Sequence, residues 1–308
     1  MSGVSDIGGP RSLHFTPAEF AAACARKATT RVSVCIPARN EVATVGSIVA
    51  AIVSSLCRGP EPLVDELIVM DDGSTDGTAD AARAAGAQVV VVGDVLTEFG
   101  PGRGKGNAMW KSVAASTGDV IVWCDADLES FTSSYVERLV APFFLLPDVM
   151  LVKGYYERVV DDHGVGGGRN TELVARPLLS LLFPELASVR QPLAGEYAAR
   201  REAVERVPFV QGYGVETGLL IDIAQRYGAT SVAEVDLGIR RHRHRSLADL
   251  APQAIEIMHV LLRRAGVAPE RMPSPVTLIG NDGAPRTVTT DERPPLAEIA
   301  WARPPSAR

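Results

Sequence analysis

The feature that most limits how this chain can fold is a short apolar run that ends in two acids. Residues Val120–Cys124 are all apolar, and Asp125 and Asp127 follow directly, one residue apart. A run of this length without polar alternation predicts a strand buried on both faces of a parallel sheet. Such sheets bind ligands at the carboxyl ends of their strands, which is where both acids would lie. Two carboxylates at this spacing suit a divalent cation with oxygen ligands, and a solvated acidic turn is the alternative.

Composition restricts the class of protein. The 308 residues are 46% hydrophobic and 22% charged, with a net charge of −6, which is typical of one large α/β domain or two small ones. The mild acidity argues against a nucleic-acid partner, because little excess basic charge is available for phosphates. No apolar run approaches the ~18 residues of a membrane span. The four cysteines are scattered without a C-x-x-C pair, which indicates reduced thiols in a cytoplasmic protein.

Strand and helix signals alternate through the first half of the chain. Strands are expected at 31–36, 65–70, 87–92 and 120–124, and helices at 16–26, 44–55, 78–85 and 107–116. The repeated order of strand, polar or glycine-bearing loop and helix predicts an α/β fold with a parallel sheet. Because these loops follow strands, they should gather at one edge of the sheet.

The second half and both ends are less regular. Strands are expected at 150–158 and 231–239, and helices at 171–182, 202–206, 214–227 and 250–265. Residues 1–13 are expected to be disordered. The tail from Gly266 onward has eight prolines in 43 residues, so an extended arm or partial disorder is expected there, not a domain.

Polar segments follow the first two predicted strands. Pro37–Glu41 and Asp71–Ser74 can meet over the sheet edge, where a carboxylate can accept a hydrogen bond from a base imide or a ribose hydroxyl. Turn and helix-cap chemistry is the alternative for the second segment. Asp76 and Thr78 are assigned to that structural role, and Asp72 is the better ligand candidate.

A glycine-rich basic stretch, Gly102-Arg103-Gly104-Lys105-Gly106, precedes a predicted helix. Glycines around one lysine at a helix N-terminus favour a phosphate-bearing ligand. The stretch lacks the spacing of a Walker A loop. A mobile surface loop is the alternative.

A basic segment, Arg240–Arg245, follows the strand predicted at 231–239. In an extended chain Arg240, His242 and His244 face one way. Opposite an Asp-x-Asp motif, one imidazole could complete a metal shell. An anion-binding patch and a solvated run of charge are the alternatives.

Together these motifs resemble known enzymes. Val34–Glu41, Asp71–Asp76 and Asp125–Asp127 resemble the nucleotide-sugar half of metal-dependent glycosyltransferases with the GT-A fold. The segments of the second half resemble the actinobacterial retaining glucosyl-3-phosphoglycerate synthase family. These segments are Gly166–Pro177, Gln191–Tyr197, Gly212–Glu216 and Gly238–Arg243. The resemblance covers about residues 30–265.

The resemblance implies a GT-A-type, mostly parallel α/β sheet flanked by helices. It divides the chain into an N-terminal tail and short helix (1–30), a nucleotide-sugar-binding half (31–155), an acceptor-binding half (156–265) and the proline-rich tail (266–308). The implied reaction transfers glucose from UDP-glucose to the 2-hydroxyl of 3-phospho-D-glycerate with retention, a first step toward methylglucose lipopolysaccharide. The implied cofactor is Mg²⁺, for which Mn²⁺ can substitute, and the implied state is a cytoplasmic homodimer.

The resemblance also implies roles for individual residues. Those expected to hold the uridine nucleotide are Pro37, Ala38, Glu41, Asp72, Lys105, Asp125 and Ala126. Asp127 and His242 are expected to bind the metal ion together with the donor's diphosphate. Those expected at the acceptor are Gly168, Arg169, Thr171, Tyr213, Arg240 and His244. Leu193 and Glu216 would line the glucose site and, with Asp125, take part in catalysis.

Several alternatives stay open. Retention by double displacement needs a carboxylate nucleophile, for which Glu216 is the candidate. A front-face route, in which the donor's own phosphate assists the acceptor hydroxyl, needs no such group and is favoured. The chain could instead be an inverting or mannosyl transferase, with a GDP-linked donor or with a polyprenyl phosphate or other phosphorylated acceptor. A nucleotide-sugar-binding protein without turnover is the third hypothesis.

Overall fold

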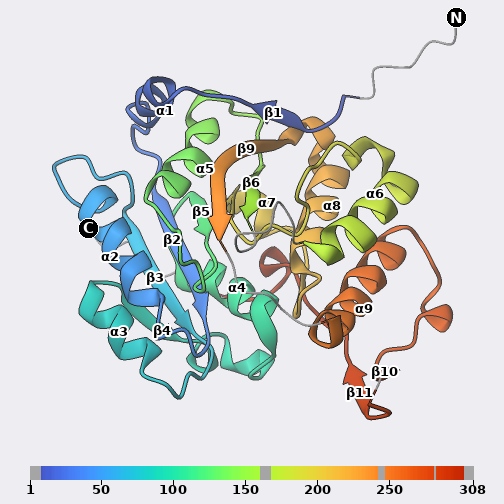
Figure 1. Ribbon diagram of the computed structural model, residues 1–308. Coiled ribbons are helices and arrows are strands. Elements are labelled where there is room, and N and C mark those ends of the chain that lie inside the picture. Colours follow the sequence, from blue (N-terminus) through green and yellow to red (C-terminus); the bar gives the residue numbers. More distant parts are fainter. Residues whose placement is uncertain (1–7, 160–167, 242–246, 281, 302–308) are drawn as a thin grey trace, which may run out of the picture.

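Eight strands form one sheet through the centre of the protein (Figure 1). The computed structural model describes residues 8–159, 168–241, 247–280 and 282–301. In spatial order the strands are β1 Arg11–Leu13, β9 Val232–Arg241, β6 Leu151–Val159, β7 Tyr197–Arg200, β5 Val120–Trp123, β2 Val32–Ala38, β3 Glu66–Asp71 and β4 Gln88–Val91. Neighbouring strands are parallel except β7, which runs antiparallel to β5 and β6. The predicted mostly parallel α/β sheet is confirmed.

Helices cover both faces of this sheet (Figure 1). They are α1 Pro17–Cys24, α2 Val45–Leu56, α3 Thr78–Ala85, α4 Gly104–Ala115, α5 Ser134–Leu145, α6 Arg176–Leu182, α7 Arg201–Val204, α8 Val215–Tyr227 and α9 Leu247–Arg264. Val34 and Ile36 share a core with α2 and α5, whereas Cys35 and Trp123 share the opposite core with α4 and α8. The central strands are therefore apolar on both faces, as fully buried parallel strands must be. No helix in the described part of the chain is long and apolar enough to cross a membrane.

Most predicted elements are present with shifted ends. Helix α3 spans the predicted residues, and the helix expected at 171–182 is a π-helical turn, Thr171–Ala175, that continues into α6. Helix α4 begins at Gly104 and not at 107, so Lys105 lies in its first turn and not in a loop. Helix α5 and strand β7 were not predicted. Residues 197–200 contain no β-branched side chain, so strand propensity gives little signal there.

The described parts of both terminal segments are more ordered than predicted, and residues 1–7 and 302–308 lie outside the described residues. Disorder is the wrong prediction for residues 11–13, because β1 pairs in parallel with β9 along the sheet edge. The tail follows the other predicted alternative and forms an extended arm, here called the C-terminal arm (266–301). In it, β10 Val276–Ile279 and β11 Pro285–Val288 form a hairpin, and β12 Glu292–Arg293 pairs antiparallel with β8 Phe209–Val210. Leu296 of the arm is fully buried, so the arm packs on the core.

Candidate active site

One large cavity opens at the carboxyl ends of the central parallel strands, with a volume of about 760 Å³. It is lined by residues from both halves of the chain. The predicted site residues among them are Pro37, Ala38, Glu41, Asp72, Lys105, Asp125, Ala126, Asp127, Gly168, Arg169, Thr171, Leu193, Tyr213, Glu216 and Arg240. The structure thus brings these residues together, while their individual roles stay predictions. His242 and His244 lie outside the described residues.

The polar segments after β2 and β3 form one end of the cavity. The Asp72 N–H donates to the Ala38 carbonyl at 3.0 Å, and the Asp72 side chain lines the cavity, where burial raises the pKa of its carboxyl. Asp76 instead accepts hydrogen bonds from the backbone N–H groups of Val42 (3.2 Å) and Thr78 (3.0 Å). Asp76 therefore fixes the turn, while Asp72 faces the space in which a ligand would lie.

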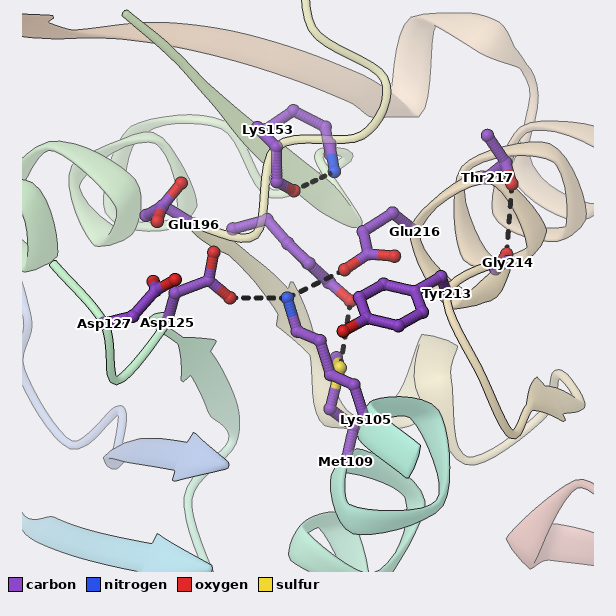
Figure 2. Close-up of polar contacts among 12 residues, drawn as sticks. Lys105, Met109, Asp125, Asp127, Lys153, Glu196, Tyr213, Gly214, Glu216 and Thr217 are labelled. Carbon is purple, nitrogen blue, oxygen red and sulfur yellow. Dashed lines mark hydrogen bonds and ion pairs between the residues drawn. The ribbon is translucent and has the colours of Figure 1, made fainter. Parts of the chain in front are cut away.

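Lys105 is at the centre of the site (Figure 2). From the first turn of α4, its ammonium contacts Asp125 Oδ1 at 2.6 Å and Glu216 Oε1 at 2.8 Å. Burial opposes the charge of Lys105, but Asp125 and Glu216 outweigh it and hold the pKa of the ammonium well above its usual range. Lys105 thus joins an acid from the first half of the chain to one from the second.

Arg240, near the end of β9, is the second buried cation of the site and is 8% exposed. One guanidinium nitrogen lies 3.2 Å from Asp125 Oδ2 and 3.5 Å from Asp127 Oδ1, and the other lies 3.0 Å from the Glu196 carboxylate. Burial disfavours ionisation of Asp125, but Lys105 and Arg240 outweigh it and hold the pKa of that carboxyl well below its usual range. Asp125 is therefore an ionised acid between two cations.

Two fully buried charged residues near these ion pairs were not singled out by the sequence analysis (Figure 2). Glu196 is fully buried and pairs with Arg240, and burial raises the pKa of its carboxyl to about 7. Lys153 is also fully buried, and its ammonium donates to the Ala194 carbonyl at 2.7 Å. Burial lowers the pKa of Lys153 to about 8. For Lys153 the available signal was a charged residue inside an apolar strand, since such residues are rarely buried without a partner. Glu196 precedes β7 and carried no such signal.

Three of the predicted acceptor residues, Gly168, Arg169 and Thr171, form one continuous part of the cavity lining. Gly168 has a φ of +71°, a conformation that favours glycine, and Arg169 follows it at the start of a helical segment. The next turn, Thr171–Ala175, is π-helical, a feature that often marks functional sites. Asn170 ties this turn to α9 by donating to the Leu250 carbonyl at 3.1 Å. This part of the lining therefore combines an arginine with a left-handed glycine and the start of a π-helical turn.

Comparison with known proteins assigns these features to a family. The Glycosyl transferase family 2 pattern matches residues 33–206. The glucosyl-3-phosphoglycerate synthase of Mycolicibacterium smegmatis is 46% identical over 282 residues, which cover 89% of this chain and 92% of that protein. The chain belongs to the glucosyl-3-phosphoglycerate synthase family. The predicted family and the assignment as a glycosyltransferase are confirmed.

Solved structures of the family share the whole fold. A crystal structure of glucosyl-3-phosphoglycerate synthase from Mycobacterium tuberculosis in complex with Mn²⁺, UDP-glucose and phosphoglyceric acid has a TM-score of 0.84 at 41% identity. The match covers 94% of this chain and 99% of that one. A second structure of that enzyme, with Mg²⁺ and UDP, has a TM-score of 0.83 at 41% identity and covers 94% and 98% of the two chains. The GT-A-type fold is therefore confirmed.

The acids of this site fit a divalent ion that takes most of its ligands from the substrate. Among the residues that the structure describes, no group of three His, Cys, Asp or Glu side chains could hold a metal ion. Mg²⁺ is commonly held by one or two carboxylates together with substrate phosphates and water. Asp127 suits this arrangement, because its side chain is 39% exposed in the cavity, against 22% for Asp125. The predicted second ligand, His242, lies outside the described residues.

Proposed function

We propose that the protein transfers glucose from UDP-glucose to the 2-hydroxyl of 3-phospho-D-glycerate with retention of configuration. The observation that carries this proposal is that one cavity is lined by residues of both halves. The strand-end acids of the first half and residues 168–171 of the second half line it together. A nucleotide sugar and a small anionic acceptor can lie there side by side. Family membership gives the substrate classes, since relatives at 43–48% identity are glucosyl-3-phosphoglycerate synthases.

In this proposal the donor lies along the first half of the cavity. Asp72 accepts from the uracil or ribose, and Asp127 with His242 would hold Mg²⁺, or Mn²⁺ in its place, against the diphosphate. The bound ion would act as a Lewis acid that stabilises the charge developing on the UDP leaving group. Lys105 contributes a fixed positive charge beside the same region, at 2.6 Å from Asp125. A positive charge that the fold already holds in place needs no reorganisation during the reaction, so it stabilises a departing anion effectively.

The acceptor would bind against the second-half wall. The Arg169 guanidinium offers parallel N–H donors that match a phosphate or carboxylate, and Gly168 lets the backbone approach closely. Both residues line the cavity that also contains Glu216 and Leu193. The acceptor hydroxyl would thus meet the sugar near the centre of the site.

Retention is assigned to the front-face route. In it the acceptor hydroxyl attacks from the side that the diphosphate leaves, and the leaving phosphate oxygen takes the hydroxyl proton. Glu216 orients the glucose, and its carboxylate is fixed by Lys105 at 2.8 Å. No protein nucleophile is required, in contrast to the double-displacement route.

One incubation tests the proposed function. The protein with Mg²⁺, UDP-glucose and 3-phosphoglycerate should release UDP and form glucosyl-3-phosphoglycerate, and omission of the acceptor should abolish rapid release. GDP-glucose, GDP-mannose and a polyprenyl phosphate in place of the proposed substrates test the competing transferase activities. Binding of UDP-glucose without turnover under all conditions would leave only the non-catalytic binding protein.

We also propose that the protein acts in the cytoplasm as a homodimer. Its scattered cysteines are unpaired thiols, which suits a reducing compartment. Burial raises the pKa of Cys35 to about 12, so this thiol is inert. Light scattering coupled to size-exclusion chromatography tests the dimer, and a mass of 32.7 kDa at micromolar concentration would contradict it.

A further inference from the structure

The glycine-bearing loop at 97–103, which leads into α4, is held by a residue of the C-terminal arm. Arg293 of β12 donates from Nε to Asn107 Oδ1 at 2.8 Å and from its terminal nitrogens to the carbonyls of Phe99 (2.5 Å) and Gly100 (3.4 Å). The Arg293 side chain is buried, with 8% of the residue exposed. A single guanidinium therefore ties the loop and the start of α4 to a strand almost two hundred residues away.

Close contacts of this kind account for Gly102 in the loop and Gly106 in α4. A Cβ at Gly102, where φ is +66°, would lie 2.2 Å from an Arg293 nitrogen and 2.0 Å from Asn107 Oδ1. A Cβ at Gly106 would lie 1.7 Å from the Val210 carbonyl oxygen of β8. All three distances are far shorter than any real Cβ contact. Close packing on the arm and on β8 thus requires these glycines, independently of the phosphate ligand that the sequence pattern suggested.

A second link connects the arm to the loop through Gln211, the residue after β8. The Gln211 N–H donates to the Asp291 carbonyl of the arm at 3.0 Å. Gln211 in turn accepts from Asn107 N at 3.1 Å through its carbonyl, and from Arg103 N at 3.0 Å through its side chain. The backbone on either side of Lys105 is therefore fixed to a segment that the arm itself fixes.

We propose that Arg293 is a positioning residue of the donor site. Lys105 lies in the first turn of α4, directly after the loop, and contacts Asp125 and Glu216 at 2.6 and 2.8 Å. Arg293 holds the loop and the start of α4 in the position from which the Lys105 ammonium reaches both acids. The C-terminal arm is thus part of the donor-binding structure. That the donor is UDP-glucose rests on the proposed function.

The chain offers a matched control at the other end of the same helix. Arg201, 2% exposed, donates to the carbonyls of Val113 (2.7 Å) and Gly118 (2.5 Å). Arg201 and Arg293 are thus buried arginines that bind backbone carbonyls at opposite ends of α4. Arg201→Gln and Arg293→Gln should both lower the melting temperature, because each removes hydrogen-bond donors from buried or half-buried backbone carbonyls. A purely structural role of Arg293 would make the two variants alike.

The proposal predicts that their kinetics differ. Arg293→Gln should raise KM for UDP-glucose about tenfold or more, since small misplacements of binding groups have effects up to about a hundredfold. KM for 3-phosphoglycerate should stay near the wild-type value. Arg293→Lys, which keeps the charge but loses the fork of donors, should be intermediate. Arg201→Gln should leave both KM values unchanged.

Hydrogen exchange gives a readout that needs no substrate. The amides of residues 97–107 should exchange faster in Arg293→Gln than in wild type, and in Arg201→Gln they should not. Unchanged exchange in this loop, or equal changes of KM in both variants, would overturn the proposal. If the wild-type protein failed to turn over UDP-glucose and 3-phosphoglycerate, the proposed function would fall. The exchange result and calorimetric UDP affinity would still decide the role of Arg293.

Discussion

The two carboxylates in contact with Lys105 differ in their surroundings, and Glu216 is the one that can be tested as a nucleophile. Asp125 is held between Lys105 and Arg240, whereas Glu216 lies on α8 with its side chain 6% exposed beside the cavity. Glu216→Gln keeps the shape and one acceptor oxygen but removes the charge. We expect a slower enzyme that still forms the α-product, measured by NMR. Complete loss of transfer, with azide rescue to β-glucosyl azide, would make Glu216 the nucleophile.

Arg169 can be separated from the donor site by its kinetic effect. If its guanidinium binds an acceptor oxyanion, Arg169→Ala should raise KM for 3-phosphoglycerate while UDP affinity changes little. A hydrogen bond to a charged group contributes about 1.5–3 kcal/mol, which corresponds to roughly a ten- to hundredfold change. Steady-state kinetics and calorimetry with UDP measure the two effects. Loss of UDP binding would assign Arg169 to the donor site instead.

Glu196 should give the stability of the protein a pH dependence. Burial raises the pKa of its carboxyl from 4.5 to about 7, although Arg240 opposes the rise. Between these values the folded protein holds a proton that the unfolded chain releases. The contribution of Glu196 to stability is therefore full below about pH 4.5 and is lost as the pH rises through 7. As the pH rises from about 5 to about 8, wild type should lose this contribution and Glu196→Gln should not. The free energy of unfolding of Glu196→Gln should therefore rise by roughly 1–3 kcal/mol relative to that of wild type over this range.

Urea denaturation of both proteins at a series of pH values measures this difference. The comparison isolates the titration of Glu196, because the other titrating groups are common to both chains. A difference between the two proteins that stays constant over the whole range would show that Glu196 does not titrate there.

Substitution by alanine at two glycines within helices should change the stability of the protein in opposite directions. Gly106 lies in α4, where a Cβ would meet the Val210 carbonyl oxygen at 1.7 Å, whereas at Gly46 in α2 the nearest atom would be 3.8 Å away. Gly106→Ala should therefore destabilise the protein by about 1–3 kcal/mol through overpacking. Gly46→Ala should stabilise it by about 0.5–1 kcal/mol, the usual gain in a helix. Thermal denaturation measures both, and a stable Gly106→Ala variant would contradict the close contact between α4 and β8.

Most elements with local signals were predicted from the sequence, with α5 as the exception, whereas elements that depend on distant partners were not. Thr16 and Glu19 form a capping box at the start of α1, and such a cap is readable from neighbouring residues. Strand β1 has three residues and exists because β9 offers it an edge. The placement of β12 depends likewise on β8. No pattern in the local sequence indicates either pairing, so both segments were expected to be extended or disordered.

At the scale of the whole molecule, the site was predicted as a set of residues but not as a network. The acids that end strands were readable, because the carboxyl ends of parallel strands must meet at one edge. The partner of each acid was not. Arg240 lies 44 residues from Glu196 and 115 from Asp125, and only the folded sheet brings β9 beside them. The sequence and the family resemblance predicted which residues would line the site. The ion pairs between them became visible only in the folded structure.

Binding of the metal ion and binding of the nucleotide should be coupled in this protein. In the described part of the chain, no three potential ligands converge, so Asp127 and His242 would leave most coordination positions to the diphosphate. Mg²⁺ alone should therefore bind weakly, and UDP should bind about 5- to 150-fold more tightly with Mg²⁺ than without it, a coupling of about 1–3 kcal/mol. Thermodynamic reciprocity requires UDP to strengthen Mg²⁺ binding by the same factor.

Calorimetric titrations of each ligand in the presence and absence of the other measure this coupling directly. Asp127→Asn should remove it, since the variant lacks the proposed ligand charge. Asp76→Asn is the matched control, because Asp76 accepts hydrogen bonds from backbone N–H groups in the turn after β3. It should lower stability and keep the coupling. Tight Mg²⁺ binding to the nucleotide-free protein, or equal losses in both variants, would place the metal ion elsewhere, because a site that depends on the diphosphate cannot form before the nucleotide binds.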